Sequence, residues 1–336
     1  MNDVMQALAI HQWGDKNAFE EIQIPVPTPE AQDVLIKVAY AGLNPADWKM
    51  RAGYLAEAMP NLPFPLVLGL DASGTVVAVG EEVTDLKVGD RVASGTNLFH
   101  AGKPGSYAQY LVVNQQRAVK IPDSVSFAAA ATLTTPSITA WQALFSTSKG
   151  ALKNAKGKKI LINGASGGVG SFAVQFAKHA GADVATTSST QNLSYVKSLG
   201  SHFLIDYKTQ DINKRLESFA PDGVDFILDA VGGGSLTNPL DMLKPGGTLI
   251  SIATITGDGD IEASMKQAQQ KGVNHVYAVV SDEGMHEQLT KIVAMAESGE
   301  MVFPPTQSFA MKDISTAHER METGHAQGKL VLKINH

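Results

Sequence analysis

Residues 159–170 are the segment whose residue types and spacing indicate a binding site most directly. An apolar run ends at Asn163, a glycine-rich turn follows, and apolar residues then recur at helical spacing as far as Ala180. Glycines in such a turn let backbone N–H groups approach a phosphate, and the positive end of the next helix favours the same anion. We interpret this strand, turn and helix as the seat of a dinucleotide pyrophosphate, held by Gly164, Ser166, Gly167, Gly168, Val169 and Gly170.

The end of the second strand indicates which dinucleotide binds. A site for NAD usually places an Asp or Glu there, on the ribose 2′-hydroxyl. Residues 185–192 contain no carboxylate, whereas Ser188, Ser189 and Asn192 can donate hydrogen bonds to a 2′-phosphate. This pattern favours NADPH over NADH. Two alternatives stay open, namely a glycine-rich turn without a cofactor and a merely polar loop after the strand.

The elements around this turn predict two domains. From about residue 158, candidate strands alternate with candidate helices, which is typical of a doubly wound parallel sheet. The first third is rich in strands and turns, and the tail ends in another strand near residues 328–334. We therefore expect an α/β protein in which residues 132–281 form the nucleotide-binding domain and residues 1–131 and 282–336 form one discontinuous domain. The expected strands are 159–163, 184–187, 203–206, 226–229, 248–252 and 275–280, and the expected helices include 139–145, 171–179, 193–199, 212–219, 235–243 and 261–270.

Composition narrows the function. With 336 residues the chain is long enough for two cores. A formal charge of −6 argues against nucleic acid as a partner. No apolar run approaches the roughly 20 residues that span a bilayer, and no signal peptide is evident, so we expect a cytoplasmic protein. The chain has no cysteine, which excludes disulfides, thiolate zinc sites and a cysteine nucleophile.

An ordered set of motifs resembles the medium-chain dehydrogenase/reductase superfamily, in particular its zinc-independent NADPH:quinone oxidoreductase (zeta-crystallin-like) branch. The resemblance runs nearly end to end and implies a GroES-like β-rich catalytic domain, a Rossmann domain, a nicotinamide cofactor in the cleft between them and commonly a dimer. The motifs lie at residues 41–48, 65–74, 88–92, 139–144, 164–170, 229–232 and 328–332.

Zinc members of that superfamily bind a catalytic metal through a Cys, a Gly-His-Glu segment and another Cys or acid. In this chain Asn44 stands near the first position, and Gly69-Leu70-Asp71 replaces the histidine segment. The nine histidines are scattered, and zinc needs three or four ligands at bonding distance. We therefore expect no metal. Without a Lewis acid, reduction of a conjugated carbonyl or quinone is easier than alcohol oxidation, because its negative charge delocalises and hydrogen bonds can stabilise it.

The resemblance also implies roles for individual residues. Asn44 would lie near the nicotinamide and the substrate and could donate to a developing enolate oxygen, although it is also typical of a turn before proline. Asp47 would hold that loop or line the pocket, and Tyr54 would shape the substrate slot or relay a proton. Tyr207 would contact a 2′-phosphate. The remaining cofactor contacts would come from Thr139, Val231, Gly232, Ile252, Ala253 and Lys329.

The leading hypothesis is an NADPH-dependent oxidoreductase that transfers hydride to a quinone or to an α,β-unsaturated carbonyl compound. The alternatives are a non-catalytic NADPH-binding scaffold protein and a zinc-free alcohol or polyol dehydrogenase. No general acid is identifiable, and solvent could protonate the product. The apolar residues 274–280 would form one edge of the nucleotide-binding sheet, and such an exposed edge favours a homodimer.

Overall fold

The computed structural model describes residues 3–57, 60–96, 98, 103–146, 152, 154–252, 261–324 and 327–336. The chain forms two compact units. The first contains Met1–Thr135, Asp282–Gly299 and Phe303–His336, and the second contains Pro136–Ser281 and Glu300–Val302. Among the described residues, every helix is too short or too polar to cross a membrane.

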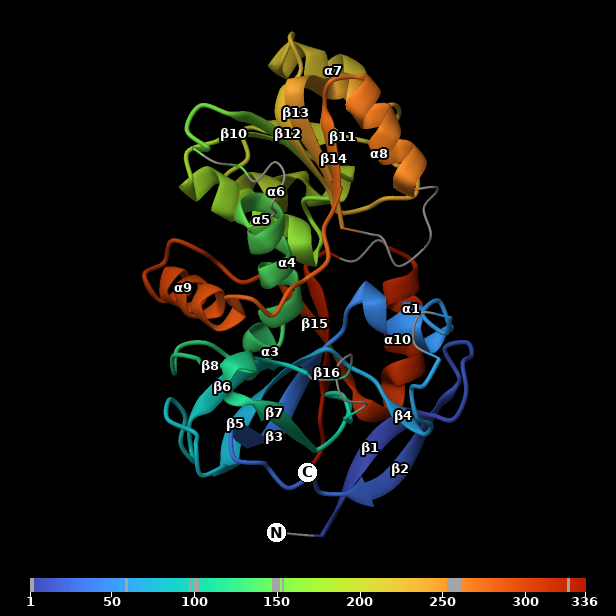
Figure 1. Cartoon of the computed structure of the whole chain (residues 1–336), viewed down its shortest axis with the longest axis vertical. Helices are drawn as coiled ribbons and strands as arrows, with labels where there is room; N and C mark the ends of the chain where they lie inside the picture. Colours follow the sequence, from blue (N-terminus) through green and yellow to red (C-terminus); the bar gives the residue numbers. More distant parts are fainter. Residues whose placement is uncertain are drawn as a thin grey trace. The chain divides into compact units, whose positions relative to one another are not determined.

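The first unit is built mainly from strands. Its larger sheet has the order β15-β16-β3-β5-β6-β8, and β7 also pairs with β3. A smaller sheet has the order β2-β1-β4. Near the end of the chain β16 runs antiparallel to β3, with Val331 opposite Gly42, so the tail completes the sheet that the first third begins (Figure 1). The bounds are β1 Val4–Ile10, β2 Phe19–Pro25, β3 Asp33–Gly42, β4 Leu66–Val67, β5 Asp71–Val79, β6 Arg91–Gly95, β7 Tyr110–Asn114, β8 Ala118–Lys120, β15 Thr306–Ala310 and β16 Lys329–Lys333.

Helices cover this unit and position its polar residues. α1 (Pro45–Arg51) follows β3 after a two-residue connection, and α10 (Ile314–Glu322) lies against α1 and β16. The buried residues of α10 recur at helical spacing, namely Ile314, Ala317, His318 and Met321. Two further helices are α3 (Phe127–Ala130) and α9 (Met285–Glu297).

The second unit is a doubly wound α/β domain. Its six strands follow the order β11-β10-β9-β12-β13-β14, and every adjacent pair is parallel. α5 and α6 cover one face of the sheet, while α7 and α8 lie on the other (Figure 1). This strand order and the β-rich first unit confirm the predicted fold class. The bounds are β9 Lys159–Asn163, α5 Gly168–His179, β10 Asp183–Ser188, α6 Leu193–Ser198, β11 Phe203–Asp206, α7 Ile212–Phe219, β12 Val224–Asp229, β13 Leu243–Ser251, α8 Ile261–Gln270 and β14 Asn274–Tyr277.

Several expected elements differ from the structure in extent, and three of these differences have a physical reason or a consequence for the predictions. The helix expected at residues 139–145 is α4, Thr134–Phe145, and it begins five residues earlier than expected. It can include Pro136 because proline is tolerated in the first turn of a helix. Residues 235–243 form only a 3₁₀ turn at Pro239–Met242, preceded by positive φ values at Gly234 and Asn238 that an α-helix cannot contain. The edge strand ends at Tyr277 instead of residue 280.

Candidate active site

Asn44 lies where β3 passes into α1, and it is the centre of a buried polar cluster in the first unit. It precedes Pro45, the first residue of α1, and has the extended backbone of a helix N-cap. Its backbone N–H donates to Asp47 Oδ2 at 2.7 Å, so the helix's own first turn holds the Asn44 loop. This contact agrees with one of the two roles expected for Asp47.

The Asn44 side chain has a single possible orientation. Lys329 Nζ, which can only donate, lies 2.5 Å from Asn44 Oδ1. Asn44 Nδ2 donates to Asp71 Oδ2, an acceptor, at 2.9 Å. Exchange of the amide oxygen and nitrogen would therefore break both contacts. The second N–H of Nδ2 makes no hydrogen bond to the described part of the chain, so it is the donor that a bound molecule can use.

Lys329 and Asp71 are buried charges that face the same amide. Lys329 is 5% exposed and also donates to the Leu43 carbonyl at 2.6 Å. Burial lowers the pKa of Lys329, while Asp71 and Asp47 act to raise it. Asp71 is fully buried and accepts from Thr135, through its backbone N–H at 2.8 Å and its hydroxyl at 2.6 Å. Burial raises the pKa of Asp71, and Lys329, Thr135 and Asn44 oppose that shift.

Asp47 is the second buried carboxyl group of this cluster. Burial raises its pKa to about 7, although its hydrogen bond from Asn44 and the charge of Lys329 act in the opposite direction. Two fully buried carboxyl groups thus share one ammonium group. A shift of this size, caused by burial together with specific charge partners, is typical of functional sites.

Two other expected residues do not join the cluster. Tyr54 is 52% exposed and packs edge-on against Trp48, with 5.7 Å between the ring centroids. It makes no hydrogen bond to Asn44 or Asp47 within the described ranges. Thr139 lies inside α4 instead of capping it, because that helix begins five residues earlier.

The glycine turn in the second unit has the shape that a phosphate site needs. Gly164 has φ +81°, a conformation that favours glycine, and a Cβ at Gly170 would lie 2.2 Å from the Gly164 carbonyl oxygen. A Cβ at Gly167 would meet nothing closer than 3.5 Å, and its φ of −80° suits any residue. The protein itself therefore does not require a glycine at residue 167, where the open side of the turn lies next to the N-terminus of α5. Gly168, Val169 and Ser166 are half-exposed along the same turn.

The end of β10 lies beside this turn. Asn192 Nδ2 donates to Ser166 Oγ at 3.1 Å. This hydrogen bond connects a residue expected to bind the 2′-phosphate with a residue of the glycine turn expected to bind the pyrophosphate. Ser189 is 5% exposed. The Ser188 hydroxyl is buried and has no hydrogen-bond partner in the described part of the chain, so it is a donor that a ligand can satisfy. These residues fit a phosphorylated dinucleotide.

Tyr207 follows β11 as expected, and its side chain is 42% exposed. Its backbone N–H donates to the Ser188 carbonyl at 3.2 Å, so the two lie side by side. Sequence reasoning missed Asp206, which pairs in register with Ser188 and brings a carboxylate to the end of the second strand. Thr190 and the Lys208 backbone N–H occupy that carboxylate, and these hydrogen bonds help to lower its pKa.

The loop after β12 completes this group. The backbone N–H groups of Val231 and Gly232 both donate to Asp229 Oδ1 at 3.0 Å. Val231 lies against the glycine turn, since a Cβ at Gly164 would be 2.6 Å from its Cγ2. Ile252 follows β13 and donates to the Asp229 carbonyl, whereas Ala253 lies outside the described residues. Apart from Thr139 and Lys329, the expected cofactor residues that the structure describes thus follow the carboxyl ends of β9, β10, β11, β12 and β13, where open parallel sheets bind ligands.

Lys329 was expected among the cofactor contacts, and the structure places it against Asn44 in the first unit, so this expectation stays a prediction. Asp71 and Thr135 are further members that sequence reasoning did not assign. Their contacts join positions 27 and 64 residues apart, which no local pattern reveals. Among the described residues, no group of three His, Asp or Glu side chains could hold a metal ion.

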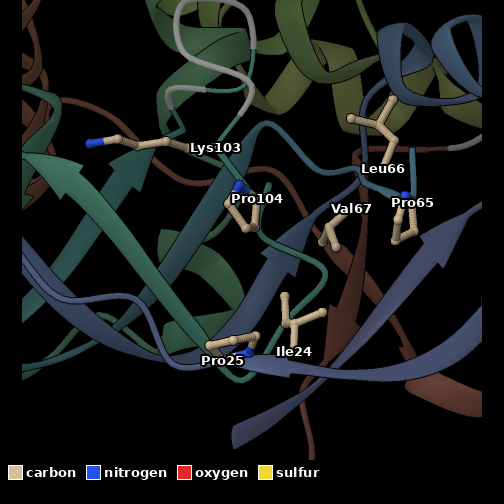
Figure 2. Close-up of a pocket in the computed structure, with 7 residues that line it drawn as sticks. All are labelled: Ile24, Pro25, Pro65, Leu66, Val67, Lys103 and Pro104. Carbon is tan, nitrogen blue, oxygen red and sulfur yellow. The ribbon is translucent and has the colours of Figure 1, made fainter. Parts of the chain in front are cut away.

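A shallow pocket elsewhere in the first unit offers little chemistry. Its volume is about 190 Å³, and its single charged residue, Lys103, pairs with Asp33 at 3.2 Å (Figure 2). The other lining residues are Ile24, Pro25, Pro65, Leu66, Val67 and Pro104.

The chain is similar to known dehydrogenases and reductases in both sequence and structure. The family model of the alcohol dehydrogenase GroES-like domain matches residues 30–123, and that of the zinc-binding dehydrogenases matches residues 199–332. The mitochondrial NAD(P)H oxidoreductase RTN4IP1 of Homo sapiens is 31% identical over 98% of this chain and 89% of its own. The chloroplastic NADPH-dependent alkenal/one oxidoreductase of Arabidopsis thaliana is 33% identical over 98% of this chain and 79% of its own. The solved quinone oxidoreductase of Coxiella burnetii superposes with a TM-score of 0.85 at 31% identity, covering 99% of this chain and all of that one.

Proposed function

This chain belongs to the medium-chain dehydrogenase/reductase superfamily, in its zinc-independent quinone oxidoreductase branch, and we propose that Asn44 is the residue that activates its substrate. The protein is an NADPH-dependent oxidoreductase that acts on quinones or α,β-unsaturated carbonyl compounds. Its relatives named for quinones and for alkenals support both substrate classes, so the choice between them rests with experiment.

The nucleotide would be held by the second unit. The glycine turn from Gly164 to Gly170 would bind the pyrophosphate through backbone N–H groups. Ser188, Ser189, Asn192 and Tyr207 would receive the 2′-phosphate, and the unsatisfied Ser188 hydroxyl supports this assignment. When bound, NADPH supplies a hydride to the substrate. Further contacts would come from Val231, Gly232, Ile252 and Ala253, and the family resemblance implies one more from Thr139.

The observation that carries the proposal for Asn44 is its locked amide. Because Lys329 and Asp71 fix both ends of the amide group, the spare N–H keeps one direction without reorganisation. A preorganised donor of this kind stabilises negative charge that develops on a carbonyl or quinone oxygen. The buried ammonium of Lys329, on the other side of the amide, adds positive potential to the same donor.

We propose three further features at the level of the whole chain. Residues 132–281 would be the nucleotide-binding domain, and residues 1–131 with 282–336 the catalytic domain. Two copies would associate through the edge strand β14, and the protein would reside in the cytoplasm. Support for the dimer comes from the position of β14 at the end of its sheet, where its outer backbone groups have no neighbouring strand in the described sheet.

Replacement of Asn44 tests its role. We expect Asn44→Ala to lower kcat/KM for a quinone and for an enone by roughly 10²–10³-fold, the usual loss for one preorganised donor. The Kd for NADPH should stay within about threefold, because the nucleotide residues are unchanged. Asn114→Ala is the matched control, since Asn114 also caps a helix, through a 3.0 Å hydrogen bond to Gln116, and has no part in the site. Full activity of Asn44→Ala would refute the proposal.

A further inference from the structure

A buried hydrogen-bond network lies beneath the glycine turn, where neighbouring strands of the second unit end. β9 runs between β10 and β12, and these strands end at Asn163, Ser188 and Asp229. Asn163 is 3% exposed, and its Nδ2 donates to Asp229 Oδ1 at 2.8 Å. Its Oδ1 accepts from the Thr187 hydroxyl at 2.5 Å. The Asn163 amide therefore connects the ends of the strands on either side of it.

Each contact of this network has one possible direction. The Gly164 backbone N–H donates to Thr187 Oγ1 at 3.0 Å, so that hydroxyl uses its single proton for Asn163 Oδ1. Asn163 Nδ2 then faces Asp229 Oδ1, and it also donates to Ser235 Oγ at 2.8 Å. Exchange of the amide oxygen and nitrogen would set the amide oxygen against the Asp229 oxygen. Only one orientation of the Asn163 amide is therefore compatible with its partners.

Thr187 fixes the start of the glycine turn. Its hydroxyl accepts from the Gly164 N–H, and its carbonyl oxygen accepts from the Ala165 N–H at 3.1 Å. The first residues of the turn thus depend on a single residue of β10. Thr187 is 1% exposed, so loss of its hydroxyl would cost two buried groups their partner, namely the Gly164 N–H and the Asn163 amide oxygen.

Asp229 fixes the loop after β12 in the same way. Its Oδ1 accepts from the N–H groups of Val231 and Gly232, both at 3.0 Å, as well as from Asn163. The Val231 side chain is 49% exposed and lies beside the glycine turn, since a Cβ at Gly164 would be 2.6 Å from its Cγ2. Hydrogen bonds to Asp229, more than burial, therefore hold this loop beside the turn.

We propose that Asn163 is a positioning residue for the cofactor, because through Thr187 and Asp229 it couples the glycine turn to the loop after β12. Both segments would then bind the dinucleotide as one preorganised surface, which costs less conformational entropy than ordering them separately. A change at either end of the network should be felt at the other end and should weaken NADPH binding. The effect on NADPH rests on the proposed function, whereas the coupling is a property of the protein without cofactor.

Hydrogen–deuterium exchange of the full chain without cofactor tests the coupling. Thr187→Val removes the hydroxyl and with it the contact that orients the Asn163 amide toward Asp229. The Val231 and Gly232 N–H groups should then exchange about tenfold faster, although they belong to the end of another strand. Thr187→Ser restores the hydroxyl and should restore the parent rates. Unchanged exchange at Val231 and Gly232 in Thr187→Val would overturn the proposal.

Thr186→Val is the matched control. Thr186 is fully buried on the same strand, and its Oγ1 lies 3.0 Å from Ser201 Oγ. Because side chains alternate along a strand, it faces away from Thr187. The replacement removes an equally buried hydroxyl, yet exchange at Val231 and Gly232 should keep the parent rate. Equal acceleration in Thr186→Val and Thr187→Val would mean a general loosening of the domain and would contradict the coupling.

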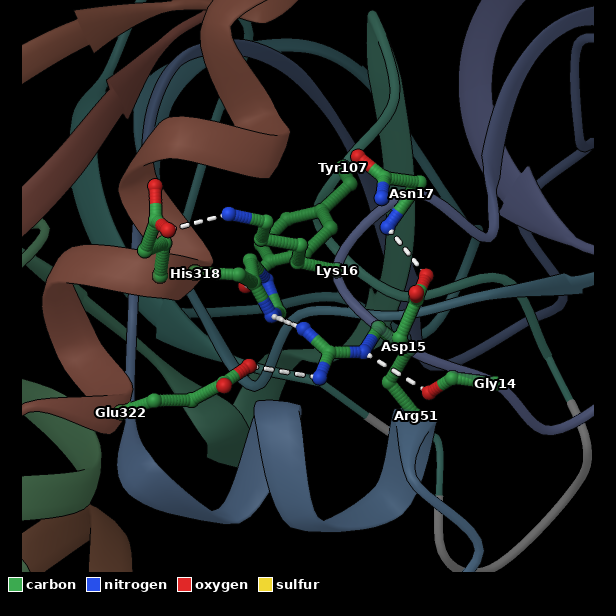
Figure 3. Close-up of polar contacts among 9 residues, drawn as sticks. Gly14, Asp15, Lys16, Asn17, Arg51, Tyr107, His318 and Glu322 are labelled. Carbon is green, nitrogen blue, oxygen red and sulfur yellow. Dashed lines mark hydrogen bonds and ion pairs between the residues drawn. The ribbon is translucent and has the colours of Figure 1, made fainter.

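A buried cluster in the first unit supplies a second control. Arg51 is 2% exposed, donates through Nη1 to His318 Nδ1 at 3.0 Å and pairs with Glu322 at 2.6 Å (Figure 3). His318→Leu deprives that donor of its partner and should lower the free energy of unfolding. Val231 and Gly232 belong to the second unit, so their exchange should not change. Faster exchange there would show that any loss of stability has the same effect, which would count against the coupling.

Asp229→Asn tests the coupling in the opposite direction and keeps the test decisive if Thr187→Val fails to fold. Asparagine retains one acceptor oxygen but loses the negative charge. It should therefore weaken the hydrogen bonds at this oxygen without leaving their donors unpaired. The Gly164 N–H, at the other end of the network, should then exchange several-fold faster. An unchanged rate at Gly164 would contradict the proposal.

Calorimetric titration relates the coupling to the cofactor. We expect Thr187→Val to raise the Kd for NADPH about tenfold, and Thr187→Ser and Thr186→Val to stay within about threefold of the parent. Adenosine 2′,5′-bisphosphate carries phosphates for the glycine turn and for the Ser188 hydroxyl, but no nicotinamide half. Asp229→Asn should nonetheless weaken its binding several-fold, because the network transmits the change to the turn. Unchanged affinity for this fragment would overturn the coupling.

The two measurements separate this inference from the proposed function. Coupled exchange in a protein that binds neither NADPH nor the fragment would support the network and refute the proposed function. NADPH affinity that Thr187→Val leaves unchanged would refute the positioning role and leave the proposed function standing.

Discussion

His318 shows how one buried side chain links structure to pH. In the folded protein its pKa is about 3, against an ordinary value of 6.5, because burial and Arg51 disfavour the charged ring. Between these values the unfolded chain binds a proton that the folded protein does not. Stability is therefore lost as pH falls below about 6.5, with a limiting slope of about 1.4 kcal/mol per pH unit.

Chemical denaturation of the parent and of His318→Gln from pH 7 to pH 4.5 tests this. Glutamine at residue 318 has no titratable group. The free energy of unfolding of the variant should therefore exceed that of the parent by a margin that grows as pH falls. Asp47 acts with the opposite sign, because its folded pKa of about 7 lies above 3.8, and it adds stability as pH falls through that range. Since both proteins contain Asp47, the difference between them isolates His318. Parallel curves would show that His318 is not a buried neutral group.

At this scale the sequence predicted the local half of the site. Asn44 and Asp47 stand at the start of a helix with the spacing of a capping pair, so their contact follows from local geometry. Lys329 and Asp71 reach Asn44 from distant strands, 285 and 27 residues away in sequence. Pairing of β16 and β5 with β3 brings them there, and these strands are too far apart in sequence for a local pattern to reveal the contacts.

At the scale of elements, apolar periodicity predicted the bounds of several strands and helices. The strands at residues 159–163 and 203–206 and the helices at 212–219 and 261–270 have the predicted bounds. α10 was not predicted, although its buried residues recur at helical spacing and it is no more polar than the correctly predicted helix at residues 212–219. The same helix supplies His318, whose buried position was therefore not predicted either.

The edge strand β14 carries the prediction that belongs to this scale. Val279, just beyond the strand, is 79% exposed, so Val279→Asp should leave the isolated chain folded. If two copies pair through this edge, the parent should have twice the chain mass of 35.6 kDa at micromolar concentration, and Val279→Asp should have the single mass. Val88→Asp, at another exposed valine in a turn of the first unit, is the control and should stay dimeric. A monomeric mass for the parent in light scattering would contradict the predicted dimer.

For the whole molecule, the chain forms two units, and the proposed nucleotide and substrate residues lie in different ones. The second unit gathers the expected nucleotide residues at the carboxyl ends of its parallel strands, as its strand order requires. The first unit depends on the chain returning to its own beginning, because β16 pairs with β3 and thereby carries Lys329 to Asn44. Both units could be predicted from the composition and periodicity of the sequence. The pairing of β16 with β3 could not, because it joins strands nearly 300 residues apart in the chain.

Calorimetric titration with NADPH and with NADH tests most directly whether this protein uses NADPH. The parent should bind NADPH more tightly than NADH, and Ser189→Asp should lose that preference because an acid repels the 2′-phosphate. Gly167→Ala should have the same free energy of unfolding as the parent, since the new Cβ meets nothing closer than 3.5 Å. It should nonetheless bind NADPH at least tenfold more weakly, because the methyl group occupies the space through which the phosphate approaches the backbone. A parent that binds neither nucleotide, or a Gly167→Ala variant with undiminished NADPH affinity, would contradict the account.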